Sequence, residues 1–270
     1  MAKKERLDVL LVERGLAETR EKAKRSIMAG VIYSENERLD KPGMKVEVDI
    51  SLRIKGDTLK YVSRGGLKLE KALDVFAFRV DHKVGLDIGA STGGFTDCAL
   101  QNGAKKMYAV DVGYNQLAWK IRQDERVVVM ERMNFRHATK DDFKEAEPEF
   151  ASIDVSFISL RLILPALSNI LADSGDVMAL IKPQFEAGKD QVGKKGIVRE
   201  PNIHKQVITD IVQFAGSIGF TPLQIDYSPI TGGEGNVEFL LHLRKGAGNS
   251  LITEENIDTV VQDSQRLKNK

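Results

Sequence analysis

Four charged side chains stand where a predicted sheet would bring them to one edge. Asp154 and Lys182 each follow a short apolar run typical of a buried strand, and Glu238 begins another such run. Lys68 lies in a helical segment that leads into the first strand. A lysine that is flanked by another cation and partly removed from water has a lowered pKa and acts as a base, while nearby acids orient its amine. We therefore expect a proton-transfer site made of two lysines and two acids.

A second chemical feature is the stretch 84–95, an apolar run that passes through an acid and small residues to a glycine pair. Glycines permit a sharp turn and let a ligand lie against bare main chain at a helix start. The spacing differs from the Gly-x-Gly-x-x-Gly of dinucleotide binders, because Ala90 and Ser91 follow Gly89. It resembles the first motif of S-adenosylmethionine (SAM) methyltransferases, acid-x-Gly-x-x-x-Gly-Gly. The expected cofactor contacts here are Asp87, Gly89, Ala90, Ser91, Thr92, Gly93 and Gly94.

Asp111 ends the next apolar run, about twenty residues further along, where a nucleotide-binding fold places its ribose acid. A carboxylate there accepts two hydrogen bonds from ribose hydroxyls. Asn134 follows the third predicted strand and is expected to border the adenine, and Asp154 is expected to reach the cofactor as well. The alternative for this pattern is a nucleotide fold that binds another ligand or none.

Strands and helices alternate from residue 84 onward, which predicts an α/β domain with a mostly parallel, Rossmann-like sheet of seven strands. Ligands of such sheets bind outside the carboxyl ends of the strands, so the charged residues and the glycines should share one cleft. The last two strands have a short connection and are expected to be antiparallel. Strands are expected near 84–88, 106–111, 127–130, 150–155, 176–181, 222–227 and 238–243, and helices near 94–101, 115–122, 160–171 and 201–218.

Residues 6–49 differ in composition and predict two short helices followed by two strands. The second helix carries four cations against one acid, Glu21, so it is either a solvated face or a surface for RNA phosphates. The pattern Arg6-Leu-Asp, Gly15-Leu, Thr19-Arg and Gly30-Val resembles the small α+β RNA-binding domain first known from ribosomal protein S4. That resemblance implies that the basic helix and the following turn contact structured RNA. The expected contacts in this domain are Arg6, Arg20, Lys22, Lys24 and Arg25.

The larger domain resembles the FtsJ-type ribose 2′-O-methyltransferases and their Lys-Asp-Lys-Glu tetrad. Carried over to this sequence, the tetrad is Lys68, Asp154, Lys182 and Glu238, with Lys182 implied to activate a ribose hydroxyl for in-line attack on the methyl of SAM. The whole chain resembles the TlyA (hemolysin A) family. That resemblance implies a SAM-dependent enzyme that methylates cytidine riboses in ribosomal RNA, with rRNA or ribosomal subunits as partners.

Competing functions are weakened by particular residues. A membrane-active toxin, suggested by the hemolysin name, would need a spanning run of about 18 apolar residues or a long cationic amphipathic helix, and neither occurs. Lys182 and Asp154 disfavour an RNA-binding protein with an inactive methyltransferase fold, and the glycine spacing disfavours a nicotinamide enzyme. Amino-group methylation of bases typically uses an Asn/Asp-Pro-Pro-aromatic motif where this chain reads Asp-Val-Ser-Phe. Carbon-5 methylation requires a nucleophilic cysteine, whereas Cys98 falls in a predicted helix.

Composition bounds the remaining possibilities. A net charge of +1 neither favours nor excludes nucleic acid, and one cysteine fits a reducing compartment. The N-terminus has no apolar block typical of a signal peptide, so a cytoplasmic location is expected. The four histidines and the cysteine lack metal-ligand spacing, so no metal is expected.

The domain limits are expected at 1–50 for the RNA-binding domain, 51–62 for a linker, 63–245 for the methyltransferase domain and 246–270 for a polar tail. The Gly- and Lys-rich loop 185–199 follows Lys182 directly and is expected to be a lid that touches RNA phosphates. The alternative is a flexible, solvated loop. Further expected RNA contacts are Arg64, Lys189, Lys194, Lys195 and Arg199.

Overall fold

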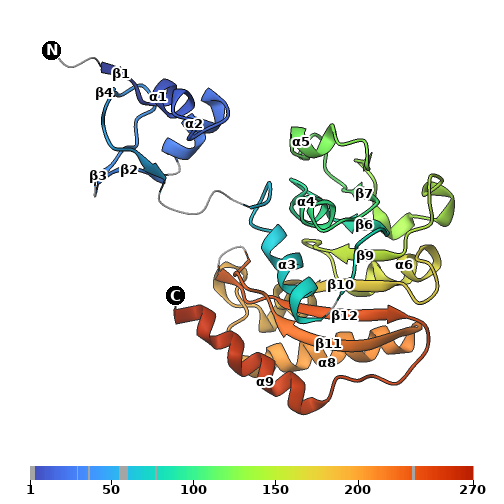
Figure 1. Cartoon of the computed structure of the whole chain (residues 1–270). Coiled ribbons are helices and arrows are strands. Elements are labelled where there is room, and N and C mark those ends of the chain that lie inside the picture. Colours follow the sequence, from blue (N-terminus) through green and yellow to red (C-terminus); the bar gives the residue numbers. More distant parts are fainter. Residues whose placement is uncertain are drawn as a thin grey trace. The chain divides into compact units, whose positions relative to one another are not determined.

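The structure is a computed structural model that describes residues 4–28, 30–35, 37–54, 60–76, 78–232 and 235–269, without the side chains of 268 and 269 (Figure 1). Contacts divide the chain into two compact units, Met1–Lys60 and Tyr61–Lys270. The sequence-based domain limits stay predictions, and residues 55–59 of the predicted linker lie outside the described residues.

The first unit packs two helices against two small sheets. The helices begin at Leu7, whose side chain is fully buried, and at Arg20, and the turn after the first contains Gly15 at φ +68°. Strand β1 pairs with β4, and β2 lies between β3 and β5, all antiparallel. The segment 51–62 is expected to be a linker that contains a short extended piece, and β5 falls inside it and pairs with β2. The elements are β1 (Lys4–Arg6), α1 (Leu7–Glu13), α2 (Arg20–Met28), β2 (Ile32–Ser34), β3 (Glu37–Arg38), β4 (Lys45–Glu47) and β5 (Arg53–Ile54).

The second unit is built on a seven-stranded sheet in the order β11-β12-β10-β9-β6-β7-β8. Five neighbouring strands are parallel, and β12 runs antiparallel to both β10 and β11. The expected α/β fold and the antiparallel final pair are therefore confirmed. The strands are β6 (Val84–Ile88), β7 (Lys106–Val110), β8 (Val127–Met130), β9 (Phe150–Ile153), β10 (Asp176–Ile181), β11 (Phe220–Tyr227) and β12 (Phe239–Lys245).

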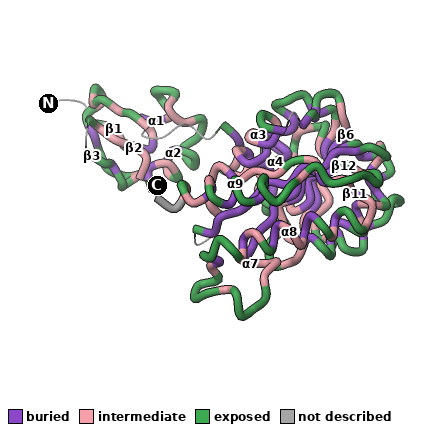
Figure 2. The backbone as a smooth tube through the Cα atoms, turned by 90° about the horizontal axis from the view of Figure 1, so that it is seen from below, coloured by how far each residue is buried: buried purple, intermediate pink, exposed green. Residues whose placement is uncertain are grey.

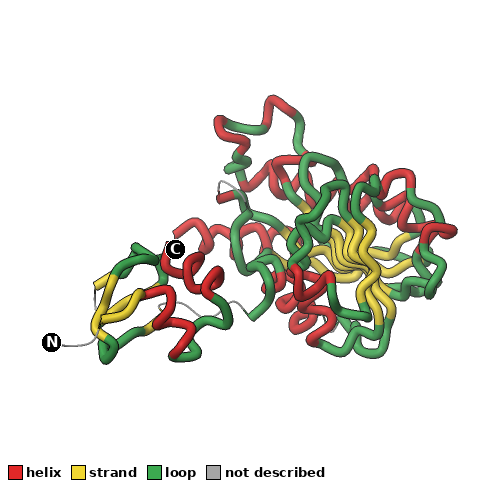
Figure 3. The backbone as a smooth tube through the Cα atoms, turned by 90° about the horizontal axis from the view of Figure 1, so that it is seen from above, coloured by secondary structure: helices red, strands yellow, loops and turns green. Residues whose placement is uncertain are grey.

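Helices cover both faces of this sheet, and the buried residues follow the strands (Figures 2 and 3). One core lies under α3 and α4 and includes Leu69 and Cys98, which agrees with a packing role for the cysteine. The other lies under α6, α8 and α9 and includes Leu167 and Ile208. The helices are α3 (Gly66–Val75), α4 (Gly94–Gln101), α5 (Trp119–Arg122), α6 (Leu164–Ile170), α7 (Pro183–Glu186), α8 (Pro201–Ser217) and α9 (Glu254–Ser264).

Some element bounds differ from the prediction for local reasons. Helix α5 begins four residues later than expected, because Asn115 has φ +57° and Ala118 is extended. The segment expected as one helix at 160–171 begins as a separate 3-10 turn, and α6 follows with Pro165 in its first turn. The polar tail forms α9, which Thr253 caps by accepting a hydrogen bond from the backbone N–H of Asn256.

Candidate active site

Three adjacent strands bring three of the four expected catalytic residues to one edge of the sheet. Asp154 follows β9, and Lys182 follows β10, which is parallel to it. Glu238 directly precedes β12, and because β12 is antiparallel, its first residue pairs with Ile181 at the end of β10. Lys68 enters from the first turn of α3. The sheet order, rather than sequence proximity, assembles this set.

The four side chains form a continuous chain of ion pairs. Lys68 Nζ lies 2.6 Å from Glu238 Oε2 and 3.2 Å from Asp154 Oδ2. The other oxygen of Asp154, Oδ1, lies 2.5 Å from Lys182 Nζ. Lys68 and Lys182 are each 7% exposed and Glu238 is 2% exposed, so the charges are paired away from bulk water. The tetrad expected from the sequence is thus brought together in one cluster.

The surroundings favour the charged forms of the two central groups. Burial lowers the pKa of Lys68, but the carboxylates of Asp154 and Glu238 outweigh it and raise that pKa above its ordinary value. Burial likewise raises the pKa of Asp154, and the two lysines outweigh it and lower that pKa. Lys68 and Asp154 therefore act as a fixed cation and a fixed anion, which does not suit Lys68 to the role of base.

Two neighbours of the tetrad were not singled out from the sequence. Lys182 Nζ donates a hydrogen bond of 3.1 Å to Ser156 Oγ, an exposed side chain two residues beyond Asp154. A Cβ on Gly232 would lie 2.1 Å from Glu238 Oε1, so only a residue without a side chain lets the backbone pass this close. Position beyond a strand end is a signal for Ser156, but no sequence signal connects Gly232 to Glu238.

The glycine loop, residues 89–94, packs directly against the backbone of Asp154, just after the end of β9. Gly89 has φ +87°, and a Cβ there would lie 2.5 Å from the backbone oxygen of Asp154. Gly93 has φ +92° and would meet Leu117 at 2.8 Å. These positions need glycine both for backbone conformation and for space. The loop that is expected to hold the cofactor is therefore in contact with the residue that holds both lysines.

Asp87 is a buried carboxylate with one oxygen left over. Its Oδ2 accepts hydrogen bonds from Thr96 N at 2.9 Å and Thr96 Oγ1 at 2.6 Å. Its Oδ1 is buried and has no hydrogen-bond partner among the residues that the structure describes. Burial raises the pKa of Asp87 to about 7. An unpaired buried carboxylate oxygen is costly, so this atom fits a donor supplied by a ligand.

Asp111 ties the glycine loop to the loop after β7. Its Oδ2 accepts from Ser91 N, and its Oδ1 accepts from Gly113 N, each at 2.7 Å. Each carboxylate oxygen keeps a further lone pair, which suits two ribose hydroxyls. Within the glycine loop, Ala90 is buried, and the Thr92 backbone oxygen accepts from Ala118 N. Asn134 is exposed and caps a 3-10 turn, so its place beside an adenine stays a prediction.

The expected RNA-contacting residues of the second unit are exposed, and four of the five lie in the segment that follows Lys182 in sequence. Lys189, Lys194, Lys195 and Arg199 are all exposed on short 3-10 turns or the loop after them. The loop is anchored at its far end, because Asn236 donates to Gly196 O at 2.9 Å and accepts from Val198 N at 3.1 Å. Arg64 is exposed in the turn before α3. Whether the loop closes as a lid stays a prediction.

In the first unit, most expected RNA contacts already have acidic partners. Arg6 and Arg20 both bind Asp8, and Lys24 pairs with Glu21 across one helical turn. Arg25 is exposed and has no ion pair within the described part of the unit. The remaining pair is Lys22 with Glu18.

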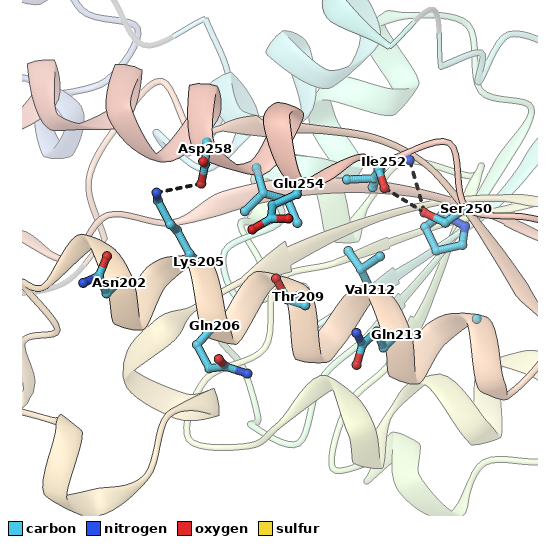
Figure 4. A pocket seen from close by; sticks show the side chains of 13 residues that line it. Asn202, Lys205, Gln206, Thr209, Val212, Gln213, Ser250, Ile252, Glu254 and Asp258 are labelled. Atoms are coloured by element: carbon cyan, nitrogen blue, oxygen red, sulfur yellow. Dashed lines mark hydrogen bonds and ion pairs between the residues drawn. The ribbon is translucent and has the colours of Figure 1, made fainter.

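A hollow of 570 Å³ is lined by residues of the segments that follow Asp154 and Lys182 in sequence, among them Phe157 and Phe185. Phe157 is 90% exposed at φ +62°, and its ring centroid lies 5.0 Å from that of Phe185. A second hollow, of 630 Å³, lies between α8 and α9, where Lys205 and Asp258 form an ion pair of 2.6 Å (Figure 4). Its lining includes none of the residues expected from the sequence to form the site.

Two further observations bear on the alternatives. None of the helices described here has the length and apolar character required to cross a membrane. Within the described ranges, no three or more His, Cys, Asp or Glu residues gather in a way that could hold a metal ion.

Comparison with known proteins gives two family matches. Residues 61–245 match the FtsJ-like methyltransferase model, and residues 5–49 match the S4 domain model. The chain is 63% identical to "Putative rRNA methyltransferase YqxC" of Bacillus subtilis, covering 100% of this chain and 97% of that protein. It is 40% identical to the 16S/23S rRNA (cytidine-2′-O)-methyltransferase TlyA of Mycobacterium tuberculosis, covering 96% and 97% of the two chains.

A solved structure described as "Putative hemolysin from Streptococcus thermophilus" matches with a TM-score of 0.79 and 55% identity, over 100% of this chain and 98% of that one. The match therefore extends across both units. The family resemblance noted in the sequence is confirmed by these findings. This chain belongs to the FtsJ-like methyltransferase family, with an S4 domain preceding the methyltransferase domain.

Proposed function

We propose that this methyltransferase transfers a methyl group from SAM to a ribose 2′-hydroxyl of ribosomal RNA, at cytidine. The observation that carries this proposal is the ion-pair chain from Glu238 through Lys68 and Asp154 to Lys182, at the carboxyl ends of the central strands. It provides a positioned amine without a cysteine nucleophile, which suits a hydroxyl acceptor. The cytidine and the ribosomal RNA come from the name of the Mycobacterium tuberculosis relative.

The residues around the glycine loop fit SAM. The Oδ1 of Asp87, which has no partner among the described residues, would accept from the ammonium group, the loop 89–94 would give the ligand bare backbone, and Asp111 would accept from the ribose hydroxyls. When bound, SAM supplies a methyl group on a sulfonium that leaves readily. Asp87, Asp111 and the loop therefore bind and orient the cofactor, and the barrier that remains is at the acceptor oxygen.

Lys182 is placed to take the proton of that acceptor. An uncharged amine has two N–H donors and one lone pair, and Asp154 and Ser156 provide acceptors for the two donors. The lone pair then faces the ribose hydroxyl. Lys68 and Glu238 hold Asp154 in place from the other side, so the amine is oriented by a buried network instead of by the substrate.

RNA binding is supported by features of both units. The S4 domain match covers the basic helix α2, and the loop after Lys182 presents exposed lysines. The exposed ring of Phe157, which packs on the partly buried ring of Phe185, offers an apolar face to an unstacked base. We accordingly assign residues 1–50 to RNA binding, 51–62 to a linker whose residues 53 and 54 form β5, 63–245 to catalysis and 246–270 to a peripheral extension, in the cytoplasm where ribosomes are found.

The test uses 30S and 50S subunits purified from cells that lack this gene, incubated with the full chain and methyl-labelled SAM. We expect label in one or both rRNAs, released on digestion as 2′-O-methylcytidine and identified by mass spectrometry of the nucleosides. The Lys182→Ala protein is the matched control and should transfer no label above background. Label on a base, or on a ribose of another nucleoside, would contradict the corresponding part of the proposal.

A further inference from the structure

Asp8 is a fully buried carboxylate in the first turn of α1. Its backbone N–H donates to Pro42 O at 3.1 Å, and the neighbouring Leu7 N–H donates to Met44 O at 2.9 Å. These bonds attach the start of α1 to the turn before β4, so the Asp8 carboxylate has a fixed position in the unit. A buried charge with this little freedom needs strong partners.

Those partners are two arginines from different elements. Asp8 Oδ1 accepts from Arg6 Nε at 2.9 Å, and Oδ2 accepts from Arg6 Nη2 at 3.1 Å, which is the two-bond fork geometry. Oδ2 also accepts from Arg20 Nη2 at 2.9 Å. Arg6 ends β1 and Arg20 begins α2, so one carboxylate brings together guanidinium groups that are fourteen residues apart in sequence.

The two arginines keep most of their binding capacity facing solvent. Their side chains are 44% and 54% exposed although Asp8 itself is not exposed. Each guanidinium has five N–H donors, and most of these have no partner among the residues described for this unit. Arg6 also lies against the bare backbone of Gly43, where a Cβ would be 3.4 Å from Nη1. Two guanidinium groups held by one carboxylate present a fixed array of donors, beside Glu5, whose carboxylate accepts from the backbone N–H of Arg6 at 2.8 Å.

We propose that Asp8 is a positioning residue that holds Arg6 and Arg20 as one preformed pair for a backbone phosphate of RNA. Planar guanidinium donors match phosphate oxygens, and a pair that is already ordered loses less side-chain entropy on binding. This inference rests on the proposed function, because RNA is the anionic polymer that the methyltransferase domain would act on. Phosphate in a lipid headgroup is the competing source of the same chemistry, and it is an outcome of the test.

The experiment compares Asp8→Asn with Glu21→Gln in the full chain. Each substitution removes one negative charge, but Glu21 forms its ion pair with the partly buried Lys24 of the same helix, whereas Asp8 is the centre of the arginine pair. If positive charge alone mattered, both variants would bind RNA more tightly. We expect Glu21→Gln to bind the 30S and 50S subunits as tightly as wild type or about twofold tighter, and Asp8→Asn to bind roughly tenfold more weakly. The logarithmic salt dependence should lose about one unit of slope in Asp8→Asn alone.

A second variant guards against misfolding of Asp8→Asn, which is checked by circular dichroism and thermal melting. Arg6→Lys combined with Arg20→Lys keeps both charges but removes the fork, and we expect at least fivefold weaker binding to the subunits. Equal or tighter binding by Asp8→Asn, or wild-type binding by the double lysine variant, would overturn the inference. So would loss of binding to phosphatidylglycerol vesicles with unchanged binding to subunits. The proposed function is judged separately, by 2′-O-methylcytidine formation by the wild-type chain.

Discussion

Asp8 in the first unit and Asp154 in the second unit each lie between two cations. Asp8 holds Arg6 and Arg20, whose side chains are 44% and 54% exposed. Asp154 holds Lys68 and Lys182, whose side chains are 8% and 9% exposed. The arrangement is the same, but the type of cation and its access to water differ.

The difference separates binding from chemistry. An arginine stays protonated under all ordinary conditions and presents a rigid fork, so an exposed pair is suited to hold an anion. A lysine carries a single amine that can exchange its proton, so in the proposed function Lys182 accepts the proton of the hydroxyl, whereas Lys68 stays charged between Asp154 and Glu238. In both clusters the carboxylate holds the cations in place. The type of cation then determines whether the cluster is suited to binding an anion or to transferring a proton.

The largest expected effect tests whether Lys182 needs to be a lysine. Lys182→Ala should lower the single-turnover methylation rate by roughly 10²–10⁴, the usual contribution of a positioned acid–base group. SAM affinity should change little, because the cofactor loop does not depend on this amine. Lys182→Arg should not restore the rate, since a guanidinium stays protonated. A near-normal rate in the arginine variant, at saturating SAM and subunits, would show that Lys182 acts only as a fixed positive charge, the role proposed for Arg6 and Arg20.

Removing the central carboxylate should destabilise the protein more at Asp154 than at Asp8. Asp154→Asn leaves Lys68 and Lys182 buried near each other without their shared anion, which should cost roughly 3–5 kcal/mol of unfolding free energy. Asp8→Asn should cost clearly less, because its two arginines remain in contact with water. Urea denaturation of both variants, followed by a probe for each unit, makes the measurement. Similar losses in the two units would remove burial as the distinguishing feature.

Asp87 shows what happens to a buried carboxylate with no cation. Its pKa in the folded chain is about 7, above the ordinary 3.8, so folding favours the protonated form. Its contribution to stability is therefore complete below about pH 4 and is lost as the pH rises to about 7. Without SAM, the stability of Asp87→Asn relative to wild type should rise across this window, by at most about 4 kcal/mol, and then stay level. A difference that does not vary with pH would contradict the assigned burial effect.

The smallest of these effects concerns Asp111, whose described partners are backbone N–H groups instead of cations. Asp111→Ala should weaken SAM binding by roughly 2–3 kcal/mol, because two hydrogen bonds from the ribose to a charged acceptor are lost. Calorimetry with SAM measures this, and Asp111→Asn serves as a control that keeps the shape and one acceptor. Unchanged affinity in the alanine variant would remove Asp111 from the cofactor site.

The sequence predicted the parts of this structure that depend on local pattern. Helix α4 has the predicted bounds, and the strand ends carrying Asp154 and Lys182 were placed within two residues. The joint position of the tetrad followed from strand order and from the family resemblance. Hydrophobic periodicity and glycine spacing are local signals that predict single elements. The parallel arrangement of the strands then brings their carboxyl ends to one edge of the sheet.

What could not be predicted depends on contacts between distant residues. The contact of Gly232 with Glu238 and the joining of Arg6 to Arg20 by Asp8 appear only in the folded chain. The late start of α5 arises from the positive φ of Asn115, which residue type alone does not decide.

The position of β12 has a consequence for how the enzyme comes into being during translation. This strand lies between β10 and β11, and β11 pairs with no other strand of the described sheet. The sheet therefore cannot be completed until β12, which ends at residue 245, is free to pair. Glu238 sits at the start of that last strand, whereas Lys68, Asp154 and Lys182 belong to earlier elements. A growing chain on the ribosome thus carries three members of the tetrad with Lys68 lacking its closest partner. The tetrad can therefore be completed only after β12 has left the ribosome and paired with β10.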